Sequence, residues 1–184
     1  MASVQEDSRL AKARLLDMQT LAEIYDAYSP GLYSYSLRLL GDAVRAEECV
    51  AETFERFLRA LQAGGGPRQY LQAYLYRIAH NWITDQYRRQ PLPDLPLEGL
   101  ENSLVGAEDA SAADFLEHAQ VRAALARLTP DQRQVVMLKY IEGWENEAVA
   151  EALGKPVSAV KSLQQRALGA LRRMLSTDDL SQKG

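Results

Sequence analysis

Five polar side chains near the C-terminus of the chain could contact DNA from one face of a helix. They recur three, four and seven residues apart, which places them on one side of a helix; they are Ser158, Lys161, Ser162, Gln165 and Arg166. Lysine, serine and glutamine can reach base edges in the major groove, and arginine can hold a phosphate. The pattern favours a DNA-recognition face, and the alternative is a solvated amphipathic face.

The elements that would position this face begin at a helix start signal. Thr129 can accept from the backbone three residues on, and Gln132 can return the bond, which is the pattern of a capping box. Pro130 suits the first turn because its missing N–H would have no partner there. A helix is therefore expected from this point to about Gly143, followed by a short helix over 145–153.

The junction between the short helix and the last one is a glycine. Gly154 permits the left-handed turn that ends a helix, and Ser158 can cap the helix that follows, to about Leu175. The opposite face of this last helix is apolar, with Val160, Leu163, Ala167 and Leu171. A short helix, a glycine turn and a longer helix together predict a helix-turn-helix.

The first half of the chain also has helical periodicity. Apolar residues recur with helical spacing over 21–28, and Ser29-Pro30-Gly31 is expected to interrupt that helix before it resumes as far as residue 40. Gly41 is expected to end the helix in a left-handed conformation.

Two more helices are expected before residue 90. Asp42 can cap the first, and Gly64-Gly65-Gly66-Pro67 closes it. The second is expected over 68–89 and should bury Trp82. Strand-like alternation is absent, so the sequence predicts an all-α fold of two small helical domains.

A segment of different composition separates the two halves. Residues 91–118 carry three prolines, no basic residue and seven acidic ones, whereas residues 119–173 carry nine basic residues against five acidic ones. The segment is expected to be an acidic flexible linker. Its leucines favour some docking over a purely solvated tether. The net charge of -4 therefore hides a basic C-terminal domain, as nucleic-acid contact would require.

Several classes of protein are disfavoured. One cysteine, Cys49, excludes an internal disulfide, and two histidines offer no spacing for a metal site, so no metal or cofactor is expected. The triglycine run lacks the lysine of a phosphate-binding loop, and no nucleophile and base are suitably spaced, so an enzyme is not expected. No apolar run is long enough to span a membrane, and no export signal is present, so a cytoplasmic protein is expected.

Long runs of the sequence resemble the extracytoplasmic-function (ECF) group of sigma-70 RNA polymerase sigma factors. LAEIYDAYSPGLYSYSLRLLGDAVRAEECVAETFERFLRAL and YLQAYLYRIAHNWITDQYRR resemble region 2, and the run from LTPDQRQVVMLKY to RALGALRRML resembles region 4. The resemblance implies domains at 19–90 and 119–175, with an N-terminal extension at 1–18, the linker at 91–118 and a tail at 176–184. It also implies a non-catalytic subunit that directs transcription initiation.

The resemblance assigns roles to residues in region 2. Glu48, Ala51 and Glu52 would bind the clamp helices of the largest polymerase subunit, and many relatives carry glutamine where Ala51 stands. Asn81 would receive a base flipped out of the minus ten element, and four more residues would support it: Tyr74, Arg77, Arg88 and Arg89. The triglycine loop offers that base only backbone, so Tyr70 or Tyr74 is the candidate for stacking on it.

In region 4 the resemblance implies contact with the minus thirty-five element. Ser158, Lys161, Ser162 and Gln165 would lie at the bases and Arg166 at the DNA backbone. The flap of the second-largest polymerase subunit and an anti-sigma factor are implied partners, with no membrane contact by the chain itself. Two alternatives are a helix-turn-helix regulator that acts without polymerase and an adaptor that binds polymerase without recognising DNA.

Overall fold

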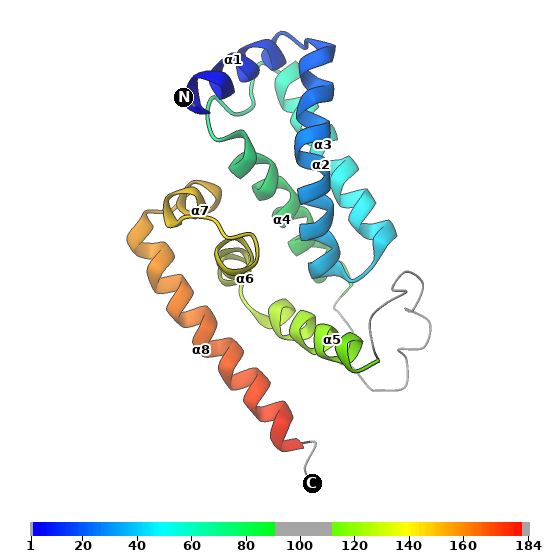
Figure 1. Ribbon diagram of the computed structural model, residues 1–184, viewed down its shortest axis with the longest axis vertical. Coiled ribbons are helices and arrows are strands. Elements are labelled where there is room, and N and C mark those ends of the chain that lie inside the picture. The colour runs from blue at the N-terminus through cyan, green and yellow to red at the C-terminus, as the bar shows by residue number, and fades with distance from the viewer. Residues whose placement is uncertain (1, 91–111, 182–184) are drawn as a thin grey trace.

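The computed structural model describes residues 2–90 and 112–181, with side chains for 6–90 and 118–176. All regular structure in these ranges is helical, which confirms the predicted class, and the domains lie one above the other in Figure 1. The helices are α1 (Ala2–Arg14), α2 (Met18–Leu40), α3 (Ala43–Gln62), α4 (Leu71–Arg89), α5 (Ala112–Arg127), α6 (Pro130–Val136), η2 (Met137–Ile141), α7 (Asn146–Leu153) and α8 (Val157–Ser181). None of the described helices is long and apolar enough to cross a membrane.

Helix α2 corrects one prediction, because it runs through Pro30 without a break. Ile24, Leu32 and Tyr35 lie on one buried face on both sides of the proline, and this burial outweighs the lost backbone hydrogen bond. Gly31 has a packing role instead. A Cβ atom there would lie 2.7 Å from the Tyr76 hydroxyl, so the glycine lets α4 approach α2 closely.

The predicted end of α2 and the predicted N-cap of α3 are confirmed. Gly41 ends α2 with a φ of 67°, and Asp42 accepts a 2.8 Å hydrogen bond from the backbone N–H of Arg45 at the start of α3. Helix α3 then buries Cys49 and Phe57 against α2 and α4. Helix α4 begins at Leu71, slightly later than expected, and Trp82 is buried as predicted.

The second domain also follows its predicted caps, with one exception. The capping box of Thr129 and Gln132 is present at α6, and Gly154 ends α7 with a φ of 63°. Ser158 is not an N-cap, because α8 already begins at Val157. The backbone N–H groups of Ala159 and Val160 bond to the Pro156 carbonyl, so the first turn closes one step earlier.

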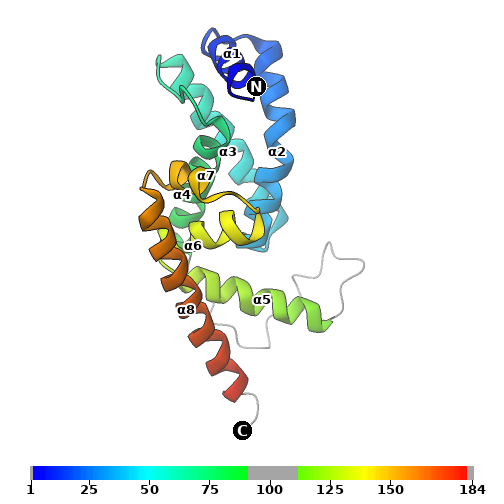
Figure 2. The same cartoon turned by 60° about the vertical axis from the view of Figure 1, so that its left-hand side comes forward.

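The expected linker differs from the structure at its C-terminal end. Helix α5 begins at Ala112, within the segment expected to be linker, and α8 continues to Ser181, into the expected tail. The linker leucines and most of its acidic residues lie at 91–111, outside the described residues. Figures 1 and 2 show α6 and α7 against α4, with α5 crossing below them and α8 extending away from the first domain.

Candidate nucleic-acid interface

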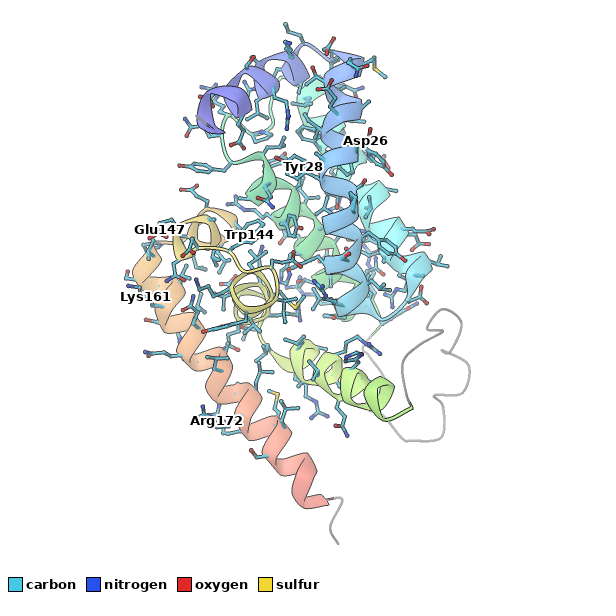
Figure 3. The ribbon with its side chains drawn as sticks, viewed as in Figure 1. Asp26, Tyr28, Trp144, Glu147, Lys161 and Arg172 are labelled. Atoms are coloured by element: carbon cyan, nitrogen blue, oxygen red, sulfur yellow. The ribbon has the colours of Figure 1, made fainter. Side chains whose placement is uncertain are left out.

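The polar strip of α8 is exposed over its whole length. All five predicted residues are on the solvent side, whereas Val160 and Ala167 on the opposite side are completely buried. Lys161 points away from the rest of the domain in Figure 3. Ser162 Oγ donates to the carbonyl of Ser158 at 3.2 Å, and Arg166 Nε donates to the carbonyl of Ser162 at 3.3 Å. The structure therefore brings the strip together as one polar face.

The angle of α8 to α7 is fixed by the turn between them and by one polar contact. Gly154 supplies the left-handed turn. Gln164 Nε2 donates to Asn146 Oδ1 at 2.7 Å, which connects α8 to the first turn of α7. Lys155, in the turn, lies 3.1 Å from the carboxylate of Asp131 on α6. These contacts connect α6, α7 and α8 on the side away from the exposed strip's own residues.

A second strip lies on α4. Tyr74, Arg77 and Asn81 are three and four residues apart, and Arg77 and Asn81 are exposed. Tyr74 is half-buried, with its ring centroid 6.2 Å from that of Phe57. Burial raises the pKa of its hydroxyl, so the group is neutral and can donate a hydrogen bond.

The last turn of α4 adds two exposed cations to this strip. Arg88 Nη1 lies 3.6 Å from the Asp85 carboxylate, and its side chain remains 72% exposed. Arg89 is exposed as well. A surface ion pair of this length contributes little and leaves the guanidinium accessible to a phosphate.

Arg77 was also expected to hold a phosphate, but in this structure it contacts the second domain. Its Nε donates to the carbonyl of Ala152 at 2.7 Å, and its Nη2 donates to the carbonyl of Glu151. Both carbonyls belong to the last turn of α7, where the helix dipole favours a cation, and the Glu151 carbonyl also accepts from the backbone N–H of Gly154. In this arrangement the guanidinium of Arg77 holds α7 against α4, and its contact with phosphate remains a prediction.

A buried histidine joins the domains beside Arg77. His80 Nδ1 lies 2.7 Å from the Tyr35 hydroxyl and Nε2 lies 2.9 Å from the Pro130 carbonyl. A carbonyl can only accept, so Nε2 carries the hydrogen and Nδ1 accepts from Tyr35. Burial, followed by the charge of Arg133, lowers the pKa of His80 to about 3, although the bond to Pro130 opposes the shift. The ring is therefore neutral.

Arg133 of α6 is the second buried polar group at the contact. It is 2% exposed, its Nη2 donates to Thr84 Oγ1 at 2.9 Å, and its guanidinium carbon lies 4.5 Å from the Tyr87 ring centroid. Burial lowers its pKa, and among the described residues its Nε has no hydrogen-bond partner. Within the described residues the charge is held by a ring, a hydroxyl and, at 3.5 Å, the Ala126 carbonyl, with no carboxylate as partner.

Two further contacts between the domains are an aromatic pair and an ion pair. The Trp144 ring centroid lies 5.0 Å from that of Tyr76, and Figure 3 places Trp144 beside α4. Arg38 of α2 lies 3.0 Å from the carboxylate of Glu142. Neither His80 nor Arg133 was expected from the sequence to have a functional role. The sequence signal that could have found them is a polar residue at a position that helical periodicity places on the inward face of each helix.

A third candidate surface lies on α3. Glu48 and Ala51 are exposed, with Val44 64% exposed beside them. Glu52 is half-buried and accepts a 2.6 Å hydrogen bond from Arg56 Nε. The face is therefore a mixture of acidic and apolar groups, which suits a protein partner with basic and apolar residues.

No cluster of metal-ligating side chains occurs in the parts of the chain that the structure describes.

An exposed polar helix on a helix-turn-helix, joined to a second helical domain, defines a two-domain DNA-binding protein. The sequence matches two known families, "Sigma-70 region 2" over residues 24–91 and "Sigma-70, region 4" over residues 118–171. The ECF RNA polymerase sigma factor SigL of Mycobacterium tuberculosis is 31% identical over 172 residues, covering 91% of this chain and 96% of SigL. The chain belongs to the ECF sigma factors of the sigma-70 family.

The chain is also similar to a second curated protein and to a solved structure. The ECF RNA polymerase sigma factor BldN of Streptomyces coelicolor is 30% identical over 170 residues, which cover 91% of this chain and 64% of BldN. The solved structure of CnrH in complex with the cytosolic domain of CnrY has the same fold, with a TM-score of 0.68 and 23% identity over 94% of this chain and 98% of that one. Sigma factors are non-catalytic polymerase subunits that direct promoter recognition and transcription initiation.

Proposed function

We propose that this chain recognises its promoters through two surfaces of its own, the α8 strip at the minus thirty-five element and the α4 strip at the minus ten element. The observation that carries the proposal is the α8 strip. Its five polar residues are exposed on one face of a helix whose other face is buried and tied to α7. A helix presented in this way fits the major groove, where lysine and glutamine can bond to base edges.

The α4 strip would act on separated strands. Asn81 can donate and accept through its amide, as a flipped base requires, and Tyr74 lies two helical turns before it. Arg88 and Arg89 add exposed positive charge for the phosphates. Arg77 would join them once its two bonds to the α7 carbonyls are released, which requires the domains to separate.

Core polymerase would bind the α3 face through Glu48, Ala51 and Glu52, with the clamp helices of the largest subunit as the partner. The flap of the second-largest subunit would bind the second domain. The acidic and apolar character of the α3 face supports the first of these contacts. In this role the chain acts in the bacterial cytoplasm, where the polymerase is.

An anti-sigma factor is a further proposed partner. One solved structure of similar fold is the sigma factor RpoE in complex with the anti-sigma factor NepR from Bartonella quintana, with a TM-score of 0.58 and 24% identity over 85% of this chain and 97% of that one. That similarity supports the fold. The partner itself is proposed from membership of the same family of factors.

The experiment compares DNA binding with and without polymerase. A labelled promoter fragment, selected from random DNA by the chain with core polymerase, would be titrated with the chain alone, core alone and both together, and its anisotropy measured. We expect tight, sequence-dependent binding only with both. Equally tight binding by the chain alone would support a regulator that acts without polymerase. Association with core and no sequence dependence would support an adaptor.

A further inference from the structure

Helix α1 lies across the loop that joins α3 to α4. Leu10 and Ala13 are 2% and 0% exposed, so the inner face of α1 is anchored in the core of the first domain. Figure 1 shows α1 at the end of the domain where α4 begins. The polar residues of the same helix contact the loop, residues 63–70, and so connect α1 to the first turn of α4.

Glu6 contacts the start of α4. Its Oε1 accepts a 2.8 Å hydrogen bond from the backbone N–H of Leu71, the first residue of that helix. Tyr70, the residue at the N-cap position, makes no side-chain capping bond. A carboxylate at a helix N-terminus satisfies an unpaired donor and favours the helix dipole. Glu6 therefore performs the capping role from a distant part of the chain.

Arg14 contacts the middle of the loop. Its Nη2 donates to the carbonyl of Gly66 at 3.3 Å and to the carbonyl of Pro67 at 3.2 Å. Gly66 has a φ of 87°, and a Cβ there would lie 2.9 Å from a methyl carbon of Leu61. The loop is thus hydrogen-bonded by Arg14 and packs closely against Leu61.

Tyr70 is the residue that these contacts present. Its φ of 56° is in the left-handed region, which is unfavourable for a tyrosine and persists only when neighbouring contacts impose it. Its side chain is 52% exposed. It immediately precedes the first residue of α4, so it lies at the N-terminal end of the helix that carries Tyr74, Arg77 and Asn81.

We propose that Glu6 and Arg14 are positioning residues for minus ten recognition, because they fix the loop 63–70 so that Tyr70 can stack on an unpaired base. An exposed aromatic ring beside a polar strip is the feature that single-stranded DNA binds by stacking. This inference rests on the proposed function, since it extends the α4 strip. The alternative role for the two residues is to stabilise the fold and nothing more.

The test measures base discrimination, because a ratio of two products is unaffected by the fraction of factor that folds. Holoenzyme would be assembled from the full chain and core polymerase, and RNA would be measured on a selected promoter and on the same promoter with each minus ten base replaced. We expect Glu6→Ala, Arg14→Ala and Tyr70→Ala to lower the discrimination ratio by about fivefold at one or more of these positions. Tyr70→Phe keeps the ring and should keep the ratio.

Matched controls separate positioning from charge. Glu6→Gln keeps an oxygen that can accept from Leu71, so it should retain most of the discrimination that Glu6→Ala loses. Asp7→Asn and Lys12→Ala remove neighbouring charges on exposed positions of α1 and should leave the ratio unchanged. Unchanged ratios in both Glu6→Ala and Arg14→Ala would overturn the proposal, and so would equal losses in the two control variants.

A second measurement needs no polymerase. Amide hydrogen exchange in the free chain should be faster at Leu71 in Glu6→Ala than in the parent protein, because the N–H loses its acceptor. An unchanged rate would overturn the role of Glu6 as a cap. If the unchanged chain directs no promoter-dependent RNA, the proposed function fails, whereas the exchange result still reports on the contact itself.

Discussion

Arg77 Nε and the carbonyl oxygen of Ala152 are 2.7 Å apart, and this hydrogen bond joins the α4 strip to the end of the helix that supports the α8 strip. One cation proposed to contact DNA is therefore used to hold the two domains together. In this closed arrangement, with the two domains in contact, Arg77 is not free to bind DNA. It becomes free only in an open form, in which the domains have separated. Separation of the domains is expected to precede minus ten recognition.

The first prediction concerns Arg77→Ala. The change removes two charge-assisted bonds to α7 carbonyls, each of which contributes roughly 1.5–3 kcal/mol, so the open population should rise by about tenfold or more. Distances between spin labels on cysteines introduced at Asp7 and Arg172, both exposed, would measure it. Cys49 is fully buried and burial raises the pKa of its thiol to about 11, so it should not be labelled. A distance distribution identical to that of the exposed control Arg68→Ala would contradict this prediction.

The second prediction is a pH dependence that arises from His80. The closed form holds the pKa of His80 at about 3, and separation of the domains exposes Nε2 and returns the pKa toward its ordinary value of about 6.5. The open form therefore binds a proton that the closed form excludes. The closed arrangement is fully stable above about pH 6.5 and loses stability as the pH falls below it, by up to ~1.4 kcal/mol per unit.

The charged and titratable groups facing His80 are Tyr35 on α2 and Arg133 on α6, and both remain unchanged in ionisation in this pH range. The same spin-label distances, recorded between about pH 7.5 and 5.5, should shift toward the open form. His80→Gln should remove the dependence and His118→Gln, at an exposed position, should retain it. Persistence of the shift in His80→Gln would assign it to another group.

The third prediction uses the buried charge of Arg133. Its desolvation is offset by one hydroxyl, one ring and a 3.5 Å contact to the Ala126 carbonyl, with no described carboxylate as partner. Methionine can fill the same volume without a charge. Arg133→Met should therefore leave the free energy of unfolding unchanged or raise it by ~1 kcal/mol. Arg133→Ala should lower it by about 2–3 kcal/mol because it also leaves a cavity. Urea unfolding measures both, and a loss in Arg133→Met as large as in Arg133→Ala would contradict the argument.

The fourth prediction separates two roles within the α8 strip. Lys161→Ala and Gln165→Ala should reduce the preference for the selected minus thirty-five sequence by ~1–3 kcal/mol at one base pair each. Arg166→Ala should instead weaken binding to all sequences equally and reduce the slope of affinity against salt concentration by about one. Anisotropy titrations of the holoenzyme at several salt concentrations distinguish these outcomes. A sequence-specific loss in Arg166→Ala would reverse the assignment.

The fifth prediction concerns the α3 face. Glu48 is exposed, so Glu48→Arg should weaken binding to core polymerase by about tenfold or more while the free chain keeps its stability. Glu52→Arg also places a cation beside Arg56, and should weaken binding and slightly lower stability. Glu23→Arg, an equal charge reversal at an exposed position of α2, provides the control. Equal core binding by all three variants would remove α3 from the interface.

Four of the helix ends could be predicted because their causes are local. Asp42, Gly41, Thr129 and Gly154 act on backbone groups within a few residues, so their types and spacing are sufficient. The predicted break at Pro30 was wrong, because the burial of α2 side chains on both sides of the proline keeps the helix continuous. Local patterns predict a conformation only where tertiary packing does not oppose it.

The candidate site divides in the same way. Exposure of the α8 strip follows from helical periodicity, so it could be predicted. The contacts of Arg77 with Ala152, and of His80 with Pro130, join residues far apart in the chain, and no local pattern specifies them. Glu6 and Arg14 were not predicted for the same reason.

Promoter recognition by this chain can be measured by run-off transcription with purified core polymerase and a promoter selected by the reconstituted holoenzyme. We expect RNA of one defined length that requires this chain, is lost when the minus thirty-five or minus ten element is scrambled, and falls strongly in the Lys161→Ala Gln165→Ala double variant. RNA that is independent of both elements, or the absence of promoter-directed RNA despite binding to core, would contradict this expectation.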